Sequence, residues 1–132
     1  MDGFATQFTK ILIIDDEKEI CLPLKEYFED EKFIVQTSNS GLDGIEQQKT
    51  FKAHIIVLDM RMPGISGIET LSALKKLGLV CVICVSAVTE KNIAEECLKN
   101  GASAYMFKPI ILEDLLGQVK VCQIEIKKKM NL

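Results

Sequence analysis

HIIVLD, residues 54–59, is a continuous apolar run that ends in an acidic residue. A second run of the same kind, ILIIDDE at residues 11–17, passes into a pair of aspartates. Strands that are apolar at every position are typical of a parallel sheet, because helices cover both of its faces. We therefore expect an α/β fold in which Asp15, Asp16 and Asp59 stand at the carboxyl ends of strands.

Working outward from these runs, strand-like and helix-like segments alternate five times. The expected strands cover residues 11–14, 33–37, 54–58, 80–85 and 104–107, and the expected helices cover residues 18–29, 42–49, 66–77, 89–99 and 112–127. Five strands are too few for a closed eight-stranded barrel. The pattern predicts one (βα)5 domain over residues 1–132, doubly wound and flavodoxin-like, with a parallel sheet in the order 2-1-3-4-5.

The composition of the chain argues against a nucleic-acid-binding protein and against a membrane protein. Hydrophobic residues make up 48% of the chain and charged residues 27%, with a net charge of −3, so we expect no direct binding of nucleic acid. No apolar run reaches the roughly 20 residues that span a bilayer, and no signal peptide is visible, which indicates a cytoplasmic protein with no membrane contact.

The five cysteines are an odd, scattered set, which suits buried thiols. Cys81 and Cys84 fall on opposite faces of one expected strand, which favours a core role over a redox motif.

Polar residues follow the strands at one edge of the predicted sheet. Ser86 ends the strand at 80–85 and Lys108 ends the strand at 104–107. Right-handed crossovers bring all carboxyl strand ends to the same edge, and the order 2-1-3-4-5 makes the first and third strands neighbours. We therefore expect Asp15, Asp16 and Asp59 to share one pocket.

Three carboxylates at close range repel one another unless a proton or a cation joins them. A set made only of oxygen ligands favours Mg²⁺, and the absence of His and Cys from it argues against zinc. A carboxylate beside Mg²⁺ can attack phosphorus, with Asp59 as the candidate nucleophile. Ser86 then offers a hydroxyl, and Lys108 a positive charge, to the phosphoryl oxygens.

These motifs, taken together with VLDMRMPG at 57–64, VSA at 85–87 and KP at 108–109, resemble the receiver domain of bacterial two-component response regulators of the chemotaxis-regulator type. The resemblance covers about residues 10–123. It implies that a histidine kinase or a phosphotransfer protein phosphorylates Asp59. It also implies Mg²⁺ ligation by Asp16, by Asp59 and by the backbone carbonyl of Arg61, with Asp15 acting mostly through water, and a cis peptide bond before Pro109.

The resemblance also implies a switch. Ser86 is expected to move toward the phosphoryl group while Tyr105 turns inward, which remodels the face formed by the fourth helix, fifth strand and fifth helix and so controls an output partner or output domain. Such a domain is a phosphoacceptor rather than an enzyme, and a monomer or a phosphorylation-dependent dimer is expected. The residues two positions after Asp59 and Ser86, Arg61 and Val88, predict slow self-dephosphorylation.

Other readings stay open at this point. A Mg²⁺-dependent phosphohydrolase of the haloacid-dehalogenase type would need an Asp-x-Asp spacing that Asp15 and Asp16 lack. A pseudo-receiver that only binds partners would not need the complete acidic set. Taken alone, Asp59 would be an ordinary turn residue. We expect Glu17 to cap the first helix, and we expect His54, at the opposite edge of the sheet, to take no part in phosphoryl transfer.

Overall fold

The structure, a computed structural model, describes residues 9–87 and 91–130. One parallel sheet of five strands runs in the order β2-β1-β3-β4-β5, which confirms the predicted topology. Its strands are β1 (Lys10–Ile14), β2 (Ile34–Ser38), β3 (Ile55–Asp59), β4 (Cys81–Ala87) and β5 (Ala104–Lys108).

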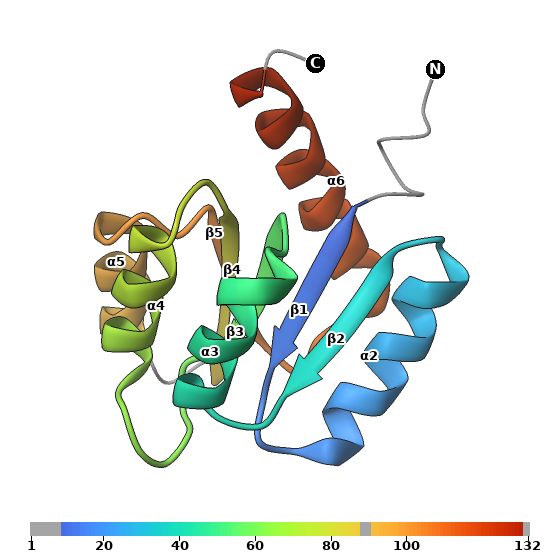
Figure 1. Cartoon of the computed structure of the whole chain (residues 1–132). Helices are drawn as coiled ribbons and strands as arrows, with labels where there is room; N and C mark the ends of the chain where they lie inside the picture. The colour runs from blue at the N-terminus through green and yellow to red at the C-terminus, as the bar shows by residue number, and fades with distance from the viewer. Residues whose placement is uncertain (1–8, 88–90, 131–132) are drawn as a thin grey trace.

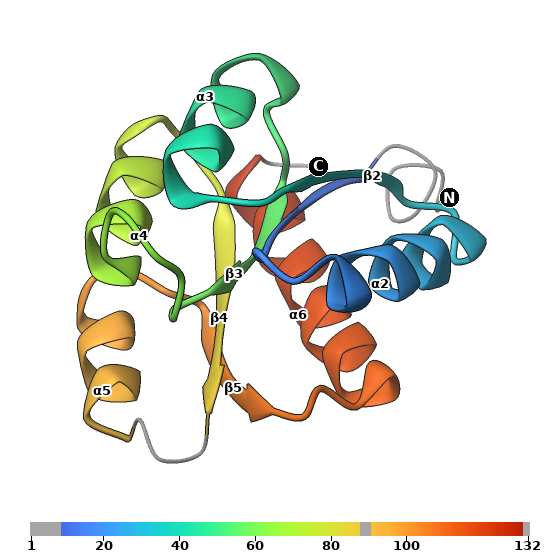
Figure 2. The ribbon, with the colours of Figure 1, turned by 90° about the horizontal axis from the view of Figure 1, so that it is seen from below.

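Helices follow every strand and cover both faces of the sheet. They are α2 (Lys18–Asp30), α3 (Gly41–Phe51), α4 (Gly67–Lys76), α5 (Lys91–Lys99) and α6 (Leu112–Lys129). Figures 1 and 2 show α2 and α6 on one face and α3, α4 and α5 on the other. The predicted boundaries agree to within two residues where they can be compared, and the expected first two residues of α5, 89 and 90, lie outside the described residues.

The core has two layers, one on each face of the sheet. Side chains of α2 and α6, such as Phe28 and Val119, pack on the layer that contains Cys81, whereas Leu71 and Leu74 of α4 pack on the layer that contains Cys84. The central strand β3 is buried at all five positions. Burial of both strand faces explains the continuous apolar runs, and it confirms that the two cysteines of β4 serve opposite halves of the core.

Local hydrogen bonds fix the starts of α3 and α4. Ser40 caps α3 by accepting a hydrogen bond from the Asp43 amide, and Ser66 and Glu69 form a capping box at α4. Glu17 stands at the N-cap position of α2, but its side chain makes no capping hydrogen bond. The expectation that Glu17 caps this helix was therefore wrong, because its carboxylate is turned toward a lysine instead.

The loop between β3 and α4 is held close to the sheet by a glycine. A Cβ atom at Gly67 would lie 2.8 Å from the backbone oxygen of Met60, so only glycine allows α4 to begin this near the end of β3. The peptide bond between Lys108 and Pro109 is cis, as expected. Within the described part of the chain, none of the helices combines the length and apolar character needed to cross a membrane.

Candidate phosphoacceptor site

Three aspartates meet at the carboxyl edge of the two central strands. Ile14 of β1 pairs with Leu58 of β3, so Asp15 and Asp59 leave neighbouring strands at the same level. Carboxylate oxygens of Asp15, Asp16 and Asp59 all lie within 4.8 Å of one another. Asp15 and Asp59 are buried, at 4% and 3% exposure, while Asp16 is exposed. The pocket expected from the sequence therefore forms, with two carboxylates inside and one at its mouth.

Backbone amides orient the two buried carboxylates. The amide of Glu17 donates to Oδ1 of Asp15 at 2.9 Å, and the amide of Arg61 donates to Oδ1 of Asp59 at 3.1 Å. Each aspartate thus holds the amide of the residue two positions later, an arrangement that short Asp side chains favour at turns. In both residues the second oxygen, Oδ2, is left to face the centre of the pocket, where it meets a lysine.

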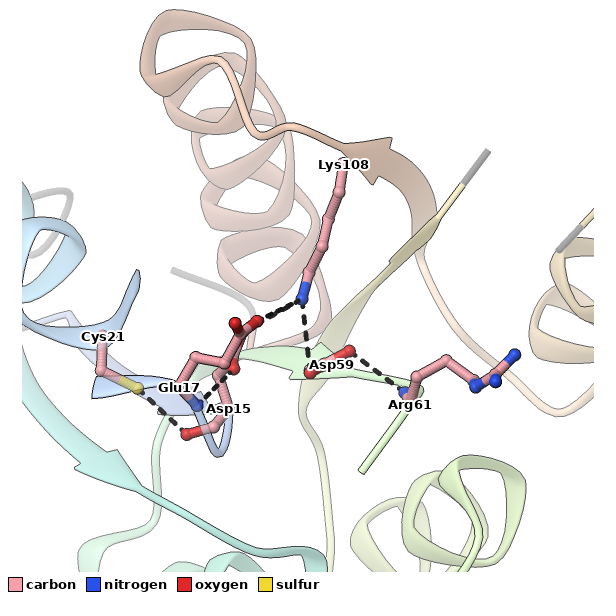
Figure 3. A network of polar contacts seen from close by, with 6 residues as sticks. All are labelled: Asp15, Glu17, Cys21, Asp59, Arg61 and Lys108. Atoms are coloured by element: carbon pink, nitrogen blue, oxygen red, sulfur yellow. Dashed lines mark hydrogen bonds and ion pairs between the residues drawn. The ribbon is translucent and has the colours of Figure 1, made fainter. Parts of the chain in front are cut away.

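Lys108 reaches across from the end of β5 to the acidic pocket, as Figure 3 shows. Its Nζ atom lies 3.4 Å from Oδ2 of Asp59 and 3.5 Å from Oδ2 of Asp15. A third carboxylate, that of Glu17, has Oε1 at 3.6 Å from the same nitrogen. One cation therefore touches three carboxylates that come from two separate strand ends.

Burial raises the pKa of Asp59, and the hydrogen bond from the Arg61 amide and the charge of Lys108 only partly oppose that shift. Burial likewise raises the pKa of Asp15, with a further increase from the charge of Asp59. For Lys108, burial alone would lower the pKa, but the charges of Asp59 and Asp15 raise it on balance. The pocket is thus short of positive charge, since three carboxylates contact one lysine and a fourth, that of Asp16, lies beside two of them.

The donor set of the pocket fits a hard cation. Its three aspartates supply only carboxylate oxygens, within a cluster narrow enough for a single ion to contact all three. Desolvation and mutual repulsion raise the pKa values of Asp15 and Asp59, and a cation would relieve both effects. The sequence prediction of an acidic cluster is therefore confirmed.

Ser86 and Tyr105 lie on the α4–α5 side of the sheet, next to the acidic pocket. Ser86 follows Val85, the register partner of Asp59, and it is 1% exposed. Its Oγ is buried and forms no hydrogen bond with any described residue. Such a hydroxyl is uncommon in a folded protein, where buried polar groups are nearly always paired. Among the described residues this hydroxyl therefore has no acceptor, and it lies one position beyond Val85, the register partner of Asp59.

Tyr105 is half-buried on the same side as Ser86. Its ring packs against the core layer of α4 and α5, with its centroid 5.3 Å from that of Phe107. Burial raises the pKa of the Tyr105 phenol, and the nearby Ser86 hydroxyl opposes this shift without completing a hydrogen bond of good geometry. Phe107 is 40% exposed, so an aromatic pair on β5 reaches the surface beside the pocket.

The positions expected to tune dephosphorylation are only partly described. The side chain of Arg61 is exposed and extends away from Asp59 in Figure 3, so contact with Asp59 is made by its backbone amide. Val88 lies outside the described residues. The prediction of slow self-dephosphorylation therefore stays a prediction.

Sequence reasoning missed the contact between Glu17 and Lys108, because Glu17 lies three residues beyond β1 and was assigned to the helix start. Its place in the acidic run DDE was the available signal. His54 lies before β3, at the opposite end of that strand from Asp59, as expected. Its Nδ1 accepts a hydrogen bond from the Lys10 amide at 3.0 Å, which gives it a role in joining β1 to β3.

An apolar groove opens next to Lys108, between α2 and the loop that leads into α6. It has a volume of about 630 Å³. The apolar residues that line it are Ile20, Pro23, Leu24, Pro109, Ile110 and Leu112. The groove therefore offers an apolar surface within one residue of the site lysine.

Comparison with known proteins gives a consistent result. The family model for the response regulator receiver domain matches residues 11–120. The transcriptional regulatory protein PdtaR of Mycobacterium tuberculosis is 26% identical over 121 residues, which cover 91% of this chain and 59% of that protein. The response regulator ArlR of Staphylococcus aureus is 28% identical over 112 residues, which cover 85% of this chain and 51% of that protein. The chain thus spans little more than half the length of these curated relatives.

Solved structures agree with the family model. A receiver domain protein of the CheY-like type from Methanospirillum hungatei superposes with a TM-score of 0.88 at 27% identity, and the match covers 92% of this chain and 98% of that one. A receiver domain protein from Clostridium thermocellum gives a TM-score of 0.85 at 28% identity, covering 94% and 99% of the two chains. With the fold, the acidic pocket and the family model in agreement, this chain belongs to the response regulator receiver domain family of two-component signalling systems.

Proposed function

We propose that this chain is a phosphorylation switch in which Asp59 accepts a phosphoryl group from a histidine kinase or a phosphotransfer protein. One observation carries the proposal: the buried carboxylate of Asp59 faces Lys108 at 3.4 Å in a pocket that holds an excess of negative charge. A carboxylate in this position is a nucleophile with a cation already placed beside it.

Mg²⁺ is the proposed cofactor. Asp15, Asp16, Asp59 and the backbone carbonyl of Arg61 would hold it, with Asp15 acting mostly through water. When bound, Mg²⁺ supplies Lewis-acid stabilisation of the negative charge on the transferring phosphoryl group. The all-oxygen donor set and the raised pKa values of Asp15 and Asp59 support this assignment.

The chain's own residues carry the transfer step. A carboxylate oxygen of Asp59 forms a bond to phosphorus while the phosphorus–nitrogen bond of the donor phosphohistidine breaks, and the leaving imidazole keeps the electron pair. The Arg61 amide fixes the carboxylate through Oδ1 during this step. The Nζ atom of Lys108 moves from the Asp59 carboxylate to the phosphoryl oxygens, so its positive charge stabilises the negative charge of the transferred group.

The switch is proposed to run through Ser86 and Tyr105. The Ser86 hydroxyl has no partner among the described residues and gains an acceptor when a phosphoryl group arrives on Asp59. Movement of Ser86 toward that group would leave space beside Tyr105, whose ring then turns inward. Phosphorylation shifts the equilibrium between two conformations, because the phosphoryl group interacts more favourably with one of them than with the other. The remodelled surface lies on α5, β5 and α6.

Partners follow from the surfaces around the pocket. The apolar groove beside Lys108 suits docking of the phosphodonor protein, since a helix seated there would bring its histidine close to Asp59. We propose that residues 1–132 form one receiver domain that controls an output partner or output domain. We expect it to act as a monomer or a phosphorylation-dependent dimer, without touching nucleic acid itself.

The test is intact-mass spectrometry after incubation with a small phosphodonor and Mg²⁺. Wild type should gain one phosphoryl group, and removal of Mg²⁺ with a chelator should prevent the gain. Asp59→Asn should stay unmodified, while Asp114→Asn, a change at an exposed aspartate in the first turn of α6, should be modified like wild type. Equal modification of Asp59→Asn and wild type would show that Asp59 is not the acceptor.

A further inference from the structure

A second cluster of ligand-type side chains lies at the far end of the sheet from Asp59. Cys81 is the first residue of β4, and Cys122 and Glu125 belong to α6. The two sulfur atoms and a carboxylate oxygen all lie within 4.8 Å of one another. The Sγ of Cys81 donates to Oε1 of Glu125 at 3.9 Å and lies 3.8 Å from the backbone oxygen of Cys122. None of these residues belongs to the phosphoacceptor pocket.

The fold holds these three side chains in place. Cys122 and Glu125 are three residues apart on α6, so they project from neighbouring positions of one helix face. Cys81 pairs with Ile55 of the central strand and packs in the same core layer as Cys122. Both thiols are buried, at 3% and 1% exposure, whereas Glu125 is exposed. The cluster is therefore rigid on its sulfur side and open to solvent on its carboxylate side.

Two sulfurs and one carboxylate oxygen form a borderline-soft donor set. Such sets favour Zn²⁺ over Mg²⁺, which takes oxygen ligands. Tetrahedral zinc with bonds of about 2.3 Å to sulfur holds two thiolates about 3.8 Å apart, a spacing that the present cluster reaches with small side-chain adjustments. Three protein ligands leave the fourth position to water, which can enter from the side of Glu125.

The local environment favours the thiolate form of one of the two cysteines, Cys81. The hydrogen bond from Cys122 lowers the pKa of Cys81, and this outweighs the effect of burial. The hydroxyl of Ser103 and the charge of Lys75 also lower the pKa of Cys81, whereas the charge of Glu125 raises it. The same interaction between the two thiols, together with burial, raises the pKa of Cys122, so a cation is needed to hold both sulfurs as thiolates.

We propose that Cys81, Cys122 and Glu125 form a binding site for a thiophilic divalent cation of the Zn²⁺ type, which links α6 to the start of β4. Both sulfurs bind the cation as thiolates, any proton that they still carry passes to solvent, and no oxidation state changes. Because α6 contributes two ligands and the sheet one, an occupied site ties the second half of α6 to the sheet, at the opposite end of the domain from the phosphoacceptor.

A second pair of buried thiols provides the internal comparison. Cys84 and Cys97 lie in the same core layer on the other face of the sheet, and both are fully buried. Among residues 9–87 and 91–130, no His, Asp or Glu joins this pair within ligand range. Cys97→Ala therefore removes a buried thiol from a pair of the same kind without touching the proposed site, which makes it the matched control for Cys122→Ala.

The test uses the full chain, kept reduced by a phosphine and saturated with Mg²⁺ so that the acidic pocket is occupied. Zn²⁺ is titrated against a chromophoric chelator, and Co²⁺ serves as the spectroscopic probe of thiolate ligation. Wild type and Cys97→Ala should bind one Zn²⁺ per chain, show the thiolate-to-Co²⁺ charge-transfer band and unfold at a higher temperature with Zn²⁺. Cys122→Ala should lose all three signals.

Glu125→Gln, a change at an exposed position that leaves both thiols in place, keeps the test informative even where Cys122→Ala folds poorly. It should weaken Zn²⁺ binding by at least about tenfold and retain a charge-transfer band at saturation. The proposal is overturned by wild type that binds no Zn²⁺ under these conditions, by binding without a thiolate band, or by Cys122→Ala or Glu125→Gln that binds as tightly as wild type.

Discussion

The Nζ atom of Lys108 lies 3.4 Å from Oδ2 of Asp59, which joins the end of β5 to the end of β3 across the intervening strand. The same nitrogen contacts Asp15 and Glu17, so one lysine balances part of the charge of several carboxylates. The remaining negative charge destabilises the pocket in the absence of a cation. Because of this excess of negative charge, removing a carboxylate from the pocket should change the stability of the protein.

Asp59→Asn should raise the free energy of unfolding by roughly 0.5–2 kcal/mol at pH 7 without Mg²⁺, because function and stability conflict at this residue. Burial and the charge of Asp16 raise the pKa of Asp59, which shows that its ionised form is disfavoured, and Lys108 keeps Asp15 and Glu17 as partners in the variant. Urea unfolding measures the change. Mg²⁺ should stabilise wild type more than the variant.

Asp43→Asn is the control for that experiment. Hydrogen bonds from Ser38 and Gln47 lower the pKa of Asp43, so its charge favours the folded state and the variant should be less stable than wild type. If Asp59→Asn also destabilised the Mg²⁺-free protein, the charge imbalance assigned to the pocket would be wrong.

Ser86→Ala should leave the unphosphorylated protein within about 0.5 kcal/mol of wild type, because the lost hydroxyl has no hydrogen bond with a described residue. Thr70→Val is the contrast: Thr70 is fully buried, and its hydroxyl donates to the Ser66 backbone oxygen at 2.9 Å. That variant should lose about 1 kcal/mol. Thermal unfolding compares the two, and a large loss in Ser86→Ala would mean that its hydroxyl already has a partner.

His54 gives the fold a dependence on pH that is separate from the phosphoacceptor pocket. Burial lowers the pKa of His54, with a smaller contribution from the charge of Lys10. The unfolded chain therefore takes up a proton near pH 6.5 more readily than the folded chain, so this residue's contribution to stability is lost as the pH falls below that value.

His54→Gln removes this titration and should flatten the fall in stability between about pH 7 and pH 5 relative to wild type. Urea unfolding at several pH values measures the free energy of unfolding of both proteins. Asp15 and Asp59 change stability with pH in the opposite direction to His54, but they are present in both proteins, so their contributions cancel in the difference. Identical pH profiles for both proteins would contradict the assignment.

Phosphorylated wild type should lose its phosphoryl group with a half-life much longer than seconds. This expectation rests on the sequence, which has a long cation, Arg61, two positions after Asp59 and an apolar residue, Val88, two positions after Ser86. Arg61→Ala and Val88→Ala should each shorten that half-life several-fold. Lys76→Ala, at the exposed end of α4, should not change it. A half-life of seconds for wild type would refute this prediction.

Five alternations of strand and helix, together with the common flavodoxin-like strand order, were enough to predict the sheet. The meeting of Asp15 with Asp59 followed, because parallel topology places all carboxyl strand ends at one edge. Two other contacts between single side chains were not predictable. Glu17 turned to Lys108, and Cys81 met Cys122, because packing of side chains 41 residues apart or more is set by the folded core. No local sequence pattern marks such a contact.

Localising the phosphoryl group tests the central claim most directly. The phosphorylated full chain is reduced with borohydride, which converts an aspartyl phosphate to homoserine, and the peptide that contains residues 55–61 is sequenced by mass spectrometry. We predict homoserine at position 59 in samples treated with phosphodonor and Mg²⁺, and aspartate there in samples treated without donor. Homoserine at Asp15 or Asp16, with Asp59 unchanged, would contradict the account.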